Sequence, residues 1–346
     1  MHFDVVSPGL SLRDVAQMAT EVEELGFSGL WFPEAGRTAY LGCAMAATAT
    51  DNLEIGTAIA VAFPRSPMVT AQVAWELAEA TRGRFLLGLG SQVKAHNERR
   101  FSVRPFDHPG PRLREYVLAL RAIWRAFQGE APLDFEGEYY RFDLLTPFFS
   151  PGAIEHPEIP VYVAGVNRWM ARMAGEVCDG FHVHPFHSER YLREVIKPAI
   201  EEGARAAGRD PSGVTLACPV FAIVGDSDEE REGIRQLVKT QISFYGSTRT
   251  YRPVFEMHGW GDTTDRLREH QARGDWGAMA GEITDEMLEV YAVEADWDGV
   301  AGAILERYDG LVDRTFSYFS AGAWRASPEA AQRWRDVARV VRAGAR

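Results

Sequence analysis

Short apolar segments alternate with longer segments of helical periodicity along the chain, and this alternation constrains the fold more than any other feature. The short segments are apolar at nearly every position, as parallel strands buried on both faces are. A repeated strand–helix order predicts a parallel sheet with helices outside it. We expect eight strands: Phe3–Val6, Gly29–Phe32, Leu53–Val61, Arg84–Gly90, Pro160–Gly165, Gly180–Pro185, Val214–Gly225 and Arg314–Phe319.

Capping residues mark several of the helices between these strands. Ser11 precedes a helix that stops at Gly26, and Ser66 with Pro67 opens one that stops at Gly83. Further helices fit residues 111–128, 168–177, 189–207 and 228–245. Eight such units predict an α/β fold, a (β/α)8 TIM barrel, and a chain of 346 residues suits one domain, 1–346, with insertions.

Two segments interrupt the alternation of predicted strands and helices. Residues 130–159 contain DFEGEYYRF, whose Glu-Gly centre and flanking aromatic residues predict a β-hairpin after the fourth helix. Residues 246–296 follow the seventh helix and are rich in Trp, His, Arg and Gly. An insertion of this size in a barrel predicts a lid over the functional site.

Composition narrows the class of partner. A formal net charge of −12 argues against nucleic acids and anionic membranes, so we expect a small-molecule substrate. The start of the chain does not read as a secretory signal, and no apolar run reaches about 18 residues, which predicts a cytoplasmic protein without a membrane segment. Three scattered cysteines, Cys43, Cys178 and Cys218, predict buried, reduced thiols rather than a disulfide framework or a zinc cluster.

Three longer segments carry a resemblance to a known family, and they occur in this order: GFSGLWFPEA, NLEIGTAIAVAFPRSPMVTAQVAWELAEATRGRFLLGLGS and PEIPVYVAGVNRWMARMAGEVCDGFHVH. Together they resemble the luciferase-like flavin and deazaflavin oxidoreductases, in particular the branch that depends on coenzyme F420. The resemblance covers essentially the whole chain. It implies hydride transfer between the deazaflavin and a small organic substrate. The alternative within the same superfamily is an FMN-dependent monooxygenase.

The resemblance also implies where the cofactor lies. It places a non-prolyl cis peptide at Ala58–Ile59, within a bulge behind the cofactor ring. Glycine at the end of a strand permits close approach of the backbone, and a helix start attracts phosphate. The implied cofactor-binding residues are Ala58, Ile59 and Ala60 in the bulge, Gly90, Ser91 and Gln92 at the barrel mouth, Ala164, Gly165, Val166 and Asn167 at a helix start, and Gly180 on the next strand. The structural alternatives are an ordinary core strand at residues 56–60 and a simple tight turn at Gly165.

Glu34 and His96 are the candidates for acid–base chemistry, because they follow the second and fourth strands at the expected mouth. Relatives often carry a histidine beside the acidic residue, where this chain has Ala35, and sugar-phosphate dehydrogenases of the family carry glutamate where it has Val93. Both departures argue against a sugar-phosphate substrate. A salt-bridged rim carboxylate and a solvated loop histidine are the alternatives.

His182 and His184 support a rival hypothesis, because a His-x-His strand end begins the metal site of some hydrolase barrels. The last two strands offer no further metal ligands, so we expect no metal and interpret both histidines as contacts to cofactor or substrate. A non-catalytic flavin-binding barrel is the third class. The aromatic 246–296 insertion suits substrate enclosure better.

Two further expectations concern surfaces. Basic residues near the mouth, Arg65, Lys94, Arg99 and Arg100, suit the acidic tail of F420 or form a solvated face. The second helix is rich in small residues from Cys43 to Ala47, and the third has Val69, Val73 and Leu77. Such surfaces pack closely, so we predict a homodimer through these helices.

Overall fold

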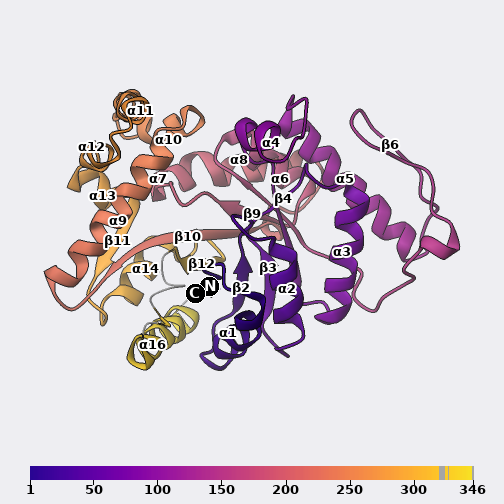
Figure 1. The fold of residues 1–346 in the computed structure, drawn as a ribbon, viewed down its shortest axis with the longest axis horizontal. Coiled ribbons are helices and arrows are strands. Elements are labelled where there is room, and N and C mark those ends of the chain that lie inside the picture. The colour runs from indigo at the N-terminus through magenta and orange to yellow at the C-terminus, as the bar shows by residue number, and fades with distance from the viewer. Residues whose placement is uncertain (319–323, 326, 345–346) are drawn as a thin grey trace.

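The computed structural model describes residues 1–318, 324–325 and 327–344, and these form the predicted TIM barrel (Figure 1). Each barrel strand pairs in parallel with the next, and the last pairs with the first. The predicted end of the eighth strand, Phe319, lies outside the described residues. The strands are β1 His2–Val6, β2 Gly29–Phe32, β3 Glu54–Thr57, β5 Phe85–Gly90, β8 Val161–Gly165, β9 Gly180–Val183, β10 Thr215–Val224 and β12 Arg314–Ser317.

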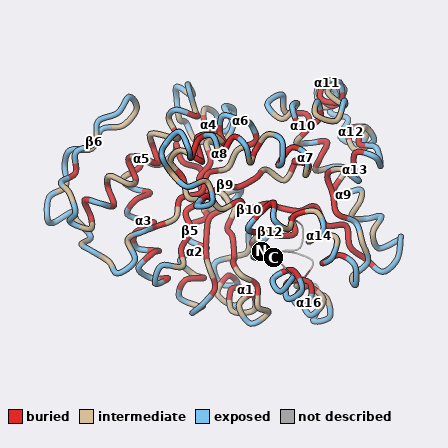
Figure 2. The backbone as a smooth tube through the Cα atoms, turned by 180° about the vertical axis from the view of Figure 1, so that it is seen from behind, coloured by how far each residue is buried: buried red, intermediate tan, exposed pale blue. Residues whose placement is uncertain are grey.

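Helices surround the closed sheet, so the strands at the centre are the most deeply buried part of the chain (Figure 2). Ser66 caps its helix, since its Oγ accepts the Val69 N–H at 3.3 Å. Ser11 makes no such bond and donates to Asp14 instead. The outer helices are α1 Leu12–Glu24, α2 Ala39–Ala47, α3 Pro67–Ala80, α4 Lys94–Arg99, α5 Pro109–Phe127, α6 Arg168–Val177, α7 Glu189–Tyr191 with the π-turn Leu192–Ile196 and α8 Lys197–Ala206, α9 Asp228–Gly246, α14 Val300–Tyr308 and α16 Pro328–Gly344.

The first insertion contains the predicted hairpin, because β6 Phe135–Glu136 and β7 Arg141–Phe142 pair antiparallel. This arm projects from the barrel beside α3 and α5 (Figure 1). The Trp75 indole of α3 donates to the Gly152 carbonyl at 3.0 Å and holds the base of the arm. Three apolar side chains on the arm are largely in solvent: Leu144, Phe148 and Phe149, at 75%, 88% and 68% exposure.

The second insertion is a packed extension of the barrel. Strand β10 is ten residues long, and its second half pairs in parallel with β11 Ala292–Ala295, a strand that the sequence did not predict. The helices α10 Arg252–Glu256, α11 Thr263–Arg273, α12 Trp276–Gly281 and α13 Asp285–Tyr291 lie beside α9 (Figure 1). The sequence AVEA is too short and polar to reveal β11 alone.

The predicted burial of the cysteines is confirmed, because Cys43, Cys178 and Cys218 are all buried, and each is a free thiol in the structure. Burial raises the pKa of each thiol, which keeps all three protonated near neutral pH. Within the described part of the chain, no helix is both long enough and apolar enough to cross a bilayer.

A charged network closes the floor of the barrel. The Arg314 guanidinium donates to both Asp4 carboxylate oxygens at 2.8 and 3.0 Å, and its other end lies 2.6 Å from Glu54. The Trp31 indole donates to Asp4 at 2.8 Å. Asp4 and Arg314 are 0% and 3% exposed, so the attraction between the two charges must compensate for the water that each has lost.

Replacing Asp4 with Asn should therefore destabilise the fold strongly. The Arg314 charge would lose its main partner inside the barrel, which costs about 3–5 kcal/mol of the free energy of unfolding. Urea unfolding followed by circular dichroism measures this. The control is Asp143→Asn, which removes a pair with Arg141 between side chains 55% and 67% exposed and should cost less than about 1 kcal/mol. Equal losses in the two variants would contradict the account.

Candidate functional site at the barrel mouth

The third predicted strand is interrupted by a bulge. Gly56 pairs with Leu86, and Ala60, in the short strand β4 Ala60–Val61, pairs with Leu89. The chain therefore advances four residues while β5 advances three, so one extra residue is inserted. The Ala58–Ile59 peptide in this bulge is cis, which confirms the position that the family resemblance implied.

Side chains replace the interrupted strand ladder at the bulge. The Thr57 hydroxyl donates to the Gly88 carbonyl at 2.6 Å and accepts the Gly88 N–H at 2.9 Å. A Cβ atom on Gly88 would lie 1.8 Å from the Thr57 carbonyl oxygen and 2.7 Å from His182 Nε2. Only glycine fits at position 88, so the bulge, β5 and His182 are packed as one unit.

His182 lies inside the barrel directly beside this bulge. Its ring packs edge-on against Trp31 at 4.8 Å and lies 5.3 Å from Tyr162. Burial and the nearby Arg314 charge lower the pKa of His182 to about 3, so the ring is neutral at physiological pH. Neither ring nitrogen makes a hydrogen bond of normal geometry with the described residues, although the side chain is buried and lies close to the Thr57 backbone. Unsatisfied nitrogens are rare in a core, and a functional role is one explanation for them.

The other residues of the bulge motif face different ways. Ala58 is partly exposed and contacts the interior cluster of Trp31 and Tyr162, so it faces the barrel mouth. Ala60 is fully buried in the packing between sheet and helices. A Cβ on Gly90 would lie 2.7 Å from the end of the Ile59 side chain, so Gly90 and the bulge are in close contact.

Ser91 and Gln92 follow Gly90 at the mouth and are partly exposed. Gln92 has a positive φ of 56°, an uncommon backbone conformation for a residue with a side chain. The buried Asn97 amide donates to the Ser91 carbonyl at 2.8 Å and fixes this turn. The structure records no hydrogen bond for the Ser91 hydroxyl among the described residues.

Residues 164–167 form the turn between β8 and α6, as predicted. Asn167 caps α6, since its Oδ1 accepts the Met170 N–H at 3.0 Å. Ala164 and Gly165 are partly exposed at the strand end, and Val166 holds the Tyr191 hydroxyl through its carbonyl at 3.1 Å. A Cβ on Gly165 would meet Met170 at 2.5 Å, so close packing accounts for the glycine.

Gly180 lies on the strand that follows α6, as predicted, but away from the cofactor site that the resemblance implied. It is the first residue of β9, at the end of the strand opposite the mouth. A Cβ there would lie 2.2 Å from the Tyr162 ring, which fills the space that glycine leaves. Gly180 is buried beneath Tyr162 and has a packing role, so we leave it out of the cofactor site.

Glu34 is a fixed carboxylate on the rim. It accepts two hydrogen bonds from Arg65, at 2.5 and 2.9 Å, and one from the Val61 N–H at 2.7 Å. Its own N–H donates to the Ile59 carbonyl at 3.1 Å. Glu34 therefore forms hydrogen bonds with the backbone of both Ile59 and Val61 in the bulge. Its ion pair with Arg65 agrees with the alternative that Glu34 is a salt-bridged carboxylate at the rim. The sequence did not reveal Arg65 as its partner, because 31 residues separate them.

His96 lies on the exposed surface of α4, and its side chain has no hydrogen bond with the described residues. Its geometry fits the solvated alternative better than the catalytic one. Of the basic residues near the mouth, Arg65 is engaged by Glu34, Lys94 lies 3.6 Å from Glu98, and Arg100 donates to the Ala35 carbonyl. Arg99 is exposed.

His184 lies one residue beyond β9, on the same side of the strand as His182. Its ring packs against Tyr245 and Tyr251, each at 4.5 Å between ring centres. The described residues contain no group of three or more His, Cys, Asp or Glu side chains arranged to hold a metal. Tyr245 was not predicted, since only folding brings the end of α9 to this strand end.

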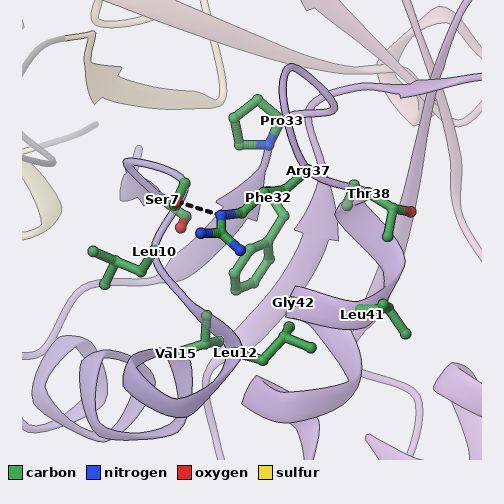
Figure 3. Close-up of a pocket in the computed structure, with 12 residues that line it drawn as sticks. Ser7, Leu10, Leu12, Val15, Phe32, Pro33, Arg37, Thr38, Leu41 and Gly42 are labelled. Atoms are coloured by element: carbon green, nitrogen blue, oxygen red, sulfur yellow. Dashed lines mark hydrogen bonds between the residues drawn. The ribbon is translucent and has the colours of Figure 1, made fainter.

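A cleft of about 230 Å³ lies beside the mouth, between the loops that follow β1 and β2 (Figure 3). The Arg37 guanidinium crosses it and donates to the Gly9 carbonyl at 2.9 Å. Its walls are mainly apolar, from Leu10, Leu12, Phe32 and Leu41. The cleft faces α1 and α2 rather than the bulge.

The chain can now be placed among known proteins. The fold is a TIM barrel, and residues 2–314 match the model of the luciferase-like monooxygenase family, to which the chain belongs. The sequence-based resemblance and the prediction of an oxidoreductase are thereby confirmed, which disfavours the hydrolase alternative.

Three similar proteins illustrate this relationship. An uncharacterised protein of Mycobacterium tuberculosis is 44% identical over 94% of this chain and 95% of its own length. The 5,10-methylenetetrahydromethanopterin reductase of Archaeoglobus fulgidus is 27% identical over 86% of this chain and 87% of its own. The structure of the coenzyme F420-dependent tetrahydromethanopterin reductase of Methanopyrus kandleri superposes with a TM-score of 0.78 at 20% identity, covering 96% and 97% of the two chains, and shows the same fold.

Replacing Gly88 with Ala tests the packing at the bulge. The new methyl group would meet the Thr57 carbonyl, and overpacking of this kind costs about 1–3 kcal/mol or more. The matched control is Gly302→Ala in α14, where a Cβ meets nothing within 4 Å and helix propensity favours alanine. Chemical denaturation should show a loss for the first variant and no loss for the second. An unchanged Gly88→Ala protein would refute the packing described for the bulge.

Proposed function

We propose that this protein transfers a hydride between coenzyme F420 and a small organic substrate at the barrel mouth. The observation that carries the proposal is the Ala58–Ile59 bulge with Ala58 facing the mouth. F420 supplies a deazaflavin carbon that gives or takes the hydride. Membership of the family and the methanopterin reductases among its relatives support this choice of cofactor.

The residues at the mouth fit a flat ring with a phosphate-bearing tail. Ala58 and Ile59 offer a small, rigid surface behind the ring, and Ser91 and Gln92 offer hydrogen bonds at its edge. The start of α6, after Gly165, offers backbone N–H groups for phosphate. The unpartnered His182 nitrogens beside the bulge add polar capacity where a polar ligand would lie.

Glu34 has a positioning role in this proposal. Because Arg65 and the Val61 N–H occupy its oxygens, the carboxylate is poorly placed to take a proton from substrate. It holds the two halves of the bulge at a fixed separation. The proton that accompanies hydride transfer must then come from another group or from water, since His96 is exposed on α4.

FMN is the second candidate, favoured by the family to which the chain belongs. FMN carries one phosphate close to its ring, which the α6 start suits, and lacks the long acidic tail of F420. The basic residues predicted for that tail are partly engaged, as Arg65 and Lys94 are paired with carboxylates. Cofactor choice is therefore decided by direct titration.

Titration of the purified protein with F420 and with FMN tests the proposal. Quenching of intrinsic Trp fluorescence should report binding of F420 well below the millimolar range. Ala58→Leu should weaken binding by at least about tenfold, because the larger side chain would occupy the ring position. The control Ala272→Leu, on the exposed surface of α11, should bind like the parent protein. The proposal would be wrong if the protein bound neither F420 nor FMN.

We also propose that the protein is a homodimer through α1, α2 and α3, which pack side by side. Helix α2, AYLGCAMAA, has no charged residue although it lies on the outside of the barrel. The exposed apolar residues Leu12, Leu41 and Val69 lie on these three helices, at 40%, 52% and 47% exposure. An uncharged outer helix with apolar neighbours is typical of a face covered by a second copy.

Replacing Leu41 with Asp should break this dimer by placing a charge at the centre of the interface. Light scattering at micromolar concentration should then give a mass near 38.6 kDa, against twice that mass for the parent protein. Leu237→Asp on α9, at 47% exposure, is the matched control and should remain dimeric. A monomeric parent protein would contradict the proposal.

A further inference from the structure

Three aromatic side chains from different parts of the chain form one surface at the mouth. His184 follows β9, Tyr245 lies in the last turn of α9, and Tyr251 ends the short 3-10 helix Arg249–Tyr251. The His184 ring lies 4.5 Å from each tyrosine ring, edge-on to Tyr245 and tilted to Tyr251. We call His184, Tyr245 and Tyr251 the aromatic wall.

The aromatic wall belongs to the barrel interior. His184 continues the alternation of Gly180 and His182, whose side faces Tyr162 and Trp31 inside the barrel. The Tyr245 hydroxyl lies 2.5 Å from the hydroxyl of Tyr318, which follows β12. All three wall residues are partly exposed, so the wall is accessible in part from outside the core.

The aromatic wall is electrically neutral. Burial raises the pKa of Tyr251, and burial together with Tyr318 raises that of Tyr245. Burial and the neighbouring His187 lower the pKa of His184, so its ring is uncharged. Among the described residues, no Lys or Arg forms a hydrogen bond, ion pair or cation–π contact with these three side chains. An anionic group placed on the wall would meet no cation that is already in contact with these side chains.

One hydrogen-bond donor of the aromatic wall has no recorded partner among the described residues. The Phe186 N–H donates to His184 Nδ1 at 3.1 Å, which places the ring proton of the neutral histidine on Nε2. Nε2 has no acceptor among the described residues. A ring-bearing ligand with one uncharged acceptor, such as a carbonyl oxygen, satisfies both the rings and this donor.

We propose that the aromatic wall is the substrate subsite and that it selects an uncharged, ring-containing carbonyl compound or alcohol over a phosphorylated or carboxylated one. The proposal rests on the proposed function, because it assigns the substrate class of the same mouth. It assigns specificity to His184, Tyr245 and Tyr251 and no proton-transfer role to any of them.

Two probes of similar size test the charge preference. Acetophenone carries a ring and a neutral carbonyl, and phenyl phosphate carries a ring and an anion. Saturation-transfer NMR titrations on the full chain without cofactor measure both affinities, so a failed F420 titration would leave this result readable. We expect acetophenone to bind more tightly than phenyl phosphate.

Variants at Tyr251 test the site. Tyr251→Leu should weaken acetophenone binding about three- to tenfold, the range that one aromatic contact supplies. Tyr251→Phe keeps the ring and should bind within about twofold of the parent protein. The control Trp276→Leu removes a ring that is 57% exposed on α12 and should have no effect. Tighter binding of phenyl phosphate, no binding of acetophenone, or parent-like affinity in Tyr251→Leu would each overturn the proposal.

Discussion

The extra residue between Gly56 and Ala60 is the constraint on which the mouth of this barrel depends. Parallel strands keep their register through evenly spaced backbone hydrogen bonds, so an inserted residue leaves groups without partners. The Thr57 side chain supplies the missing donor and acceptor for Gly88. Glu34 takes the Val61 N–H on the other side. The bulge is thus held from both directions, and Ala58 is left facing the open end.

The interior changes character from floor to mouth. At the floor, Asp4 and Arg314 form a buried ion pair, in which each charged group is the hydrogen-bond partner of the other. One layer up, Trp31 and Tyr162 fill the space left by glycines on neighbouring strands. At the mouth the residues are small or aromatic and partly exposed. This gradient separates a part of the barrel built for stability from a part open to ligands.

Much of the fold was predictable because its signals are local. Continuous apolar runs revealed all eight barrel strands, and the hairpin was legible in DFEGEYYRF. What the sequence could not reveal depends on contacts between distant residues. The partners Asp4 and Arg314 are 310 residues apart, and Tyr245 reaches His184 only because α9 returns to the mouth. Strand β11 forms because the long β10 offers it an edge.

The site residues divide along the same line. The cis peptide at Ala58–Ile59 followed from a motif, whereas the roles of single glycines did not. Gly165 and Gly180 look alike in sequence, yet one closes the turn before α6 and the other makes room for Tyr162. Glu34 could be placed at the rim, but its occupied oxygens depend on Arg65. Motifs therefore locate a site more readily than they assign its chemistry.

A crystal structure of this protein with F420 bound tests the central claim most directly. The account predicts the deazaflavin ring in van der Waals contact, about 3.5–4 Å, with the Ala58–Ile59 peptide, and its phosphate near the start of α6. A ring bound instead in the cleft between Leu12 and Leu41, away from the bulge, would contradict it.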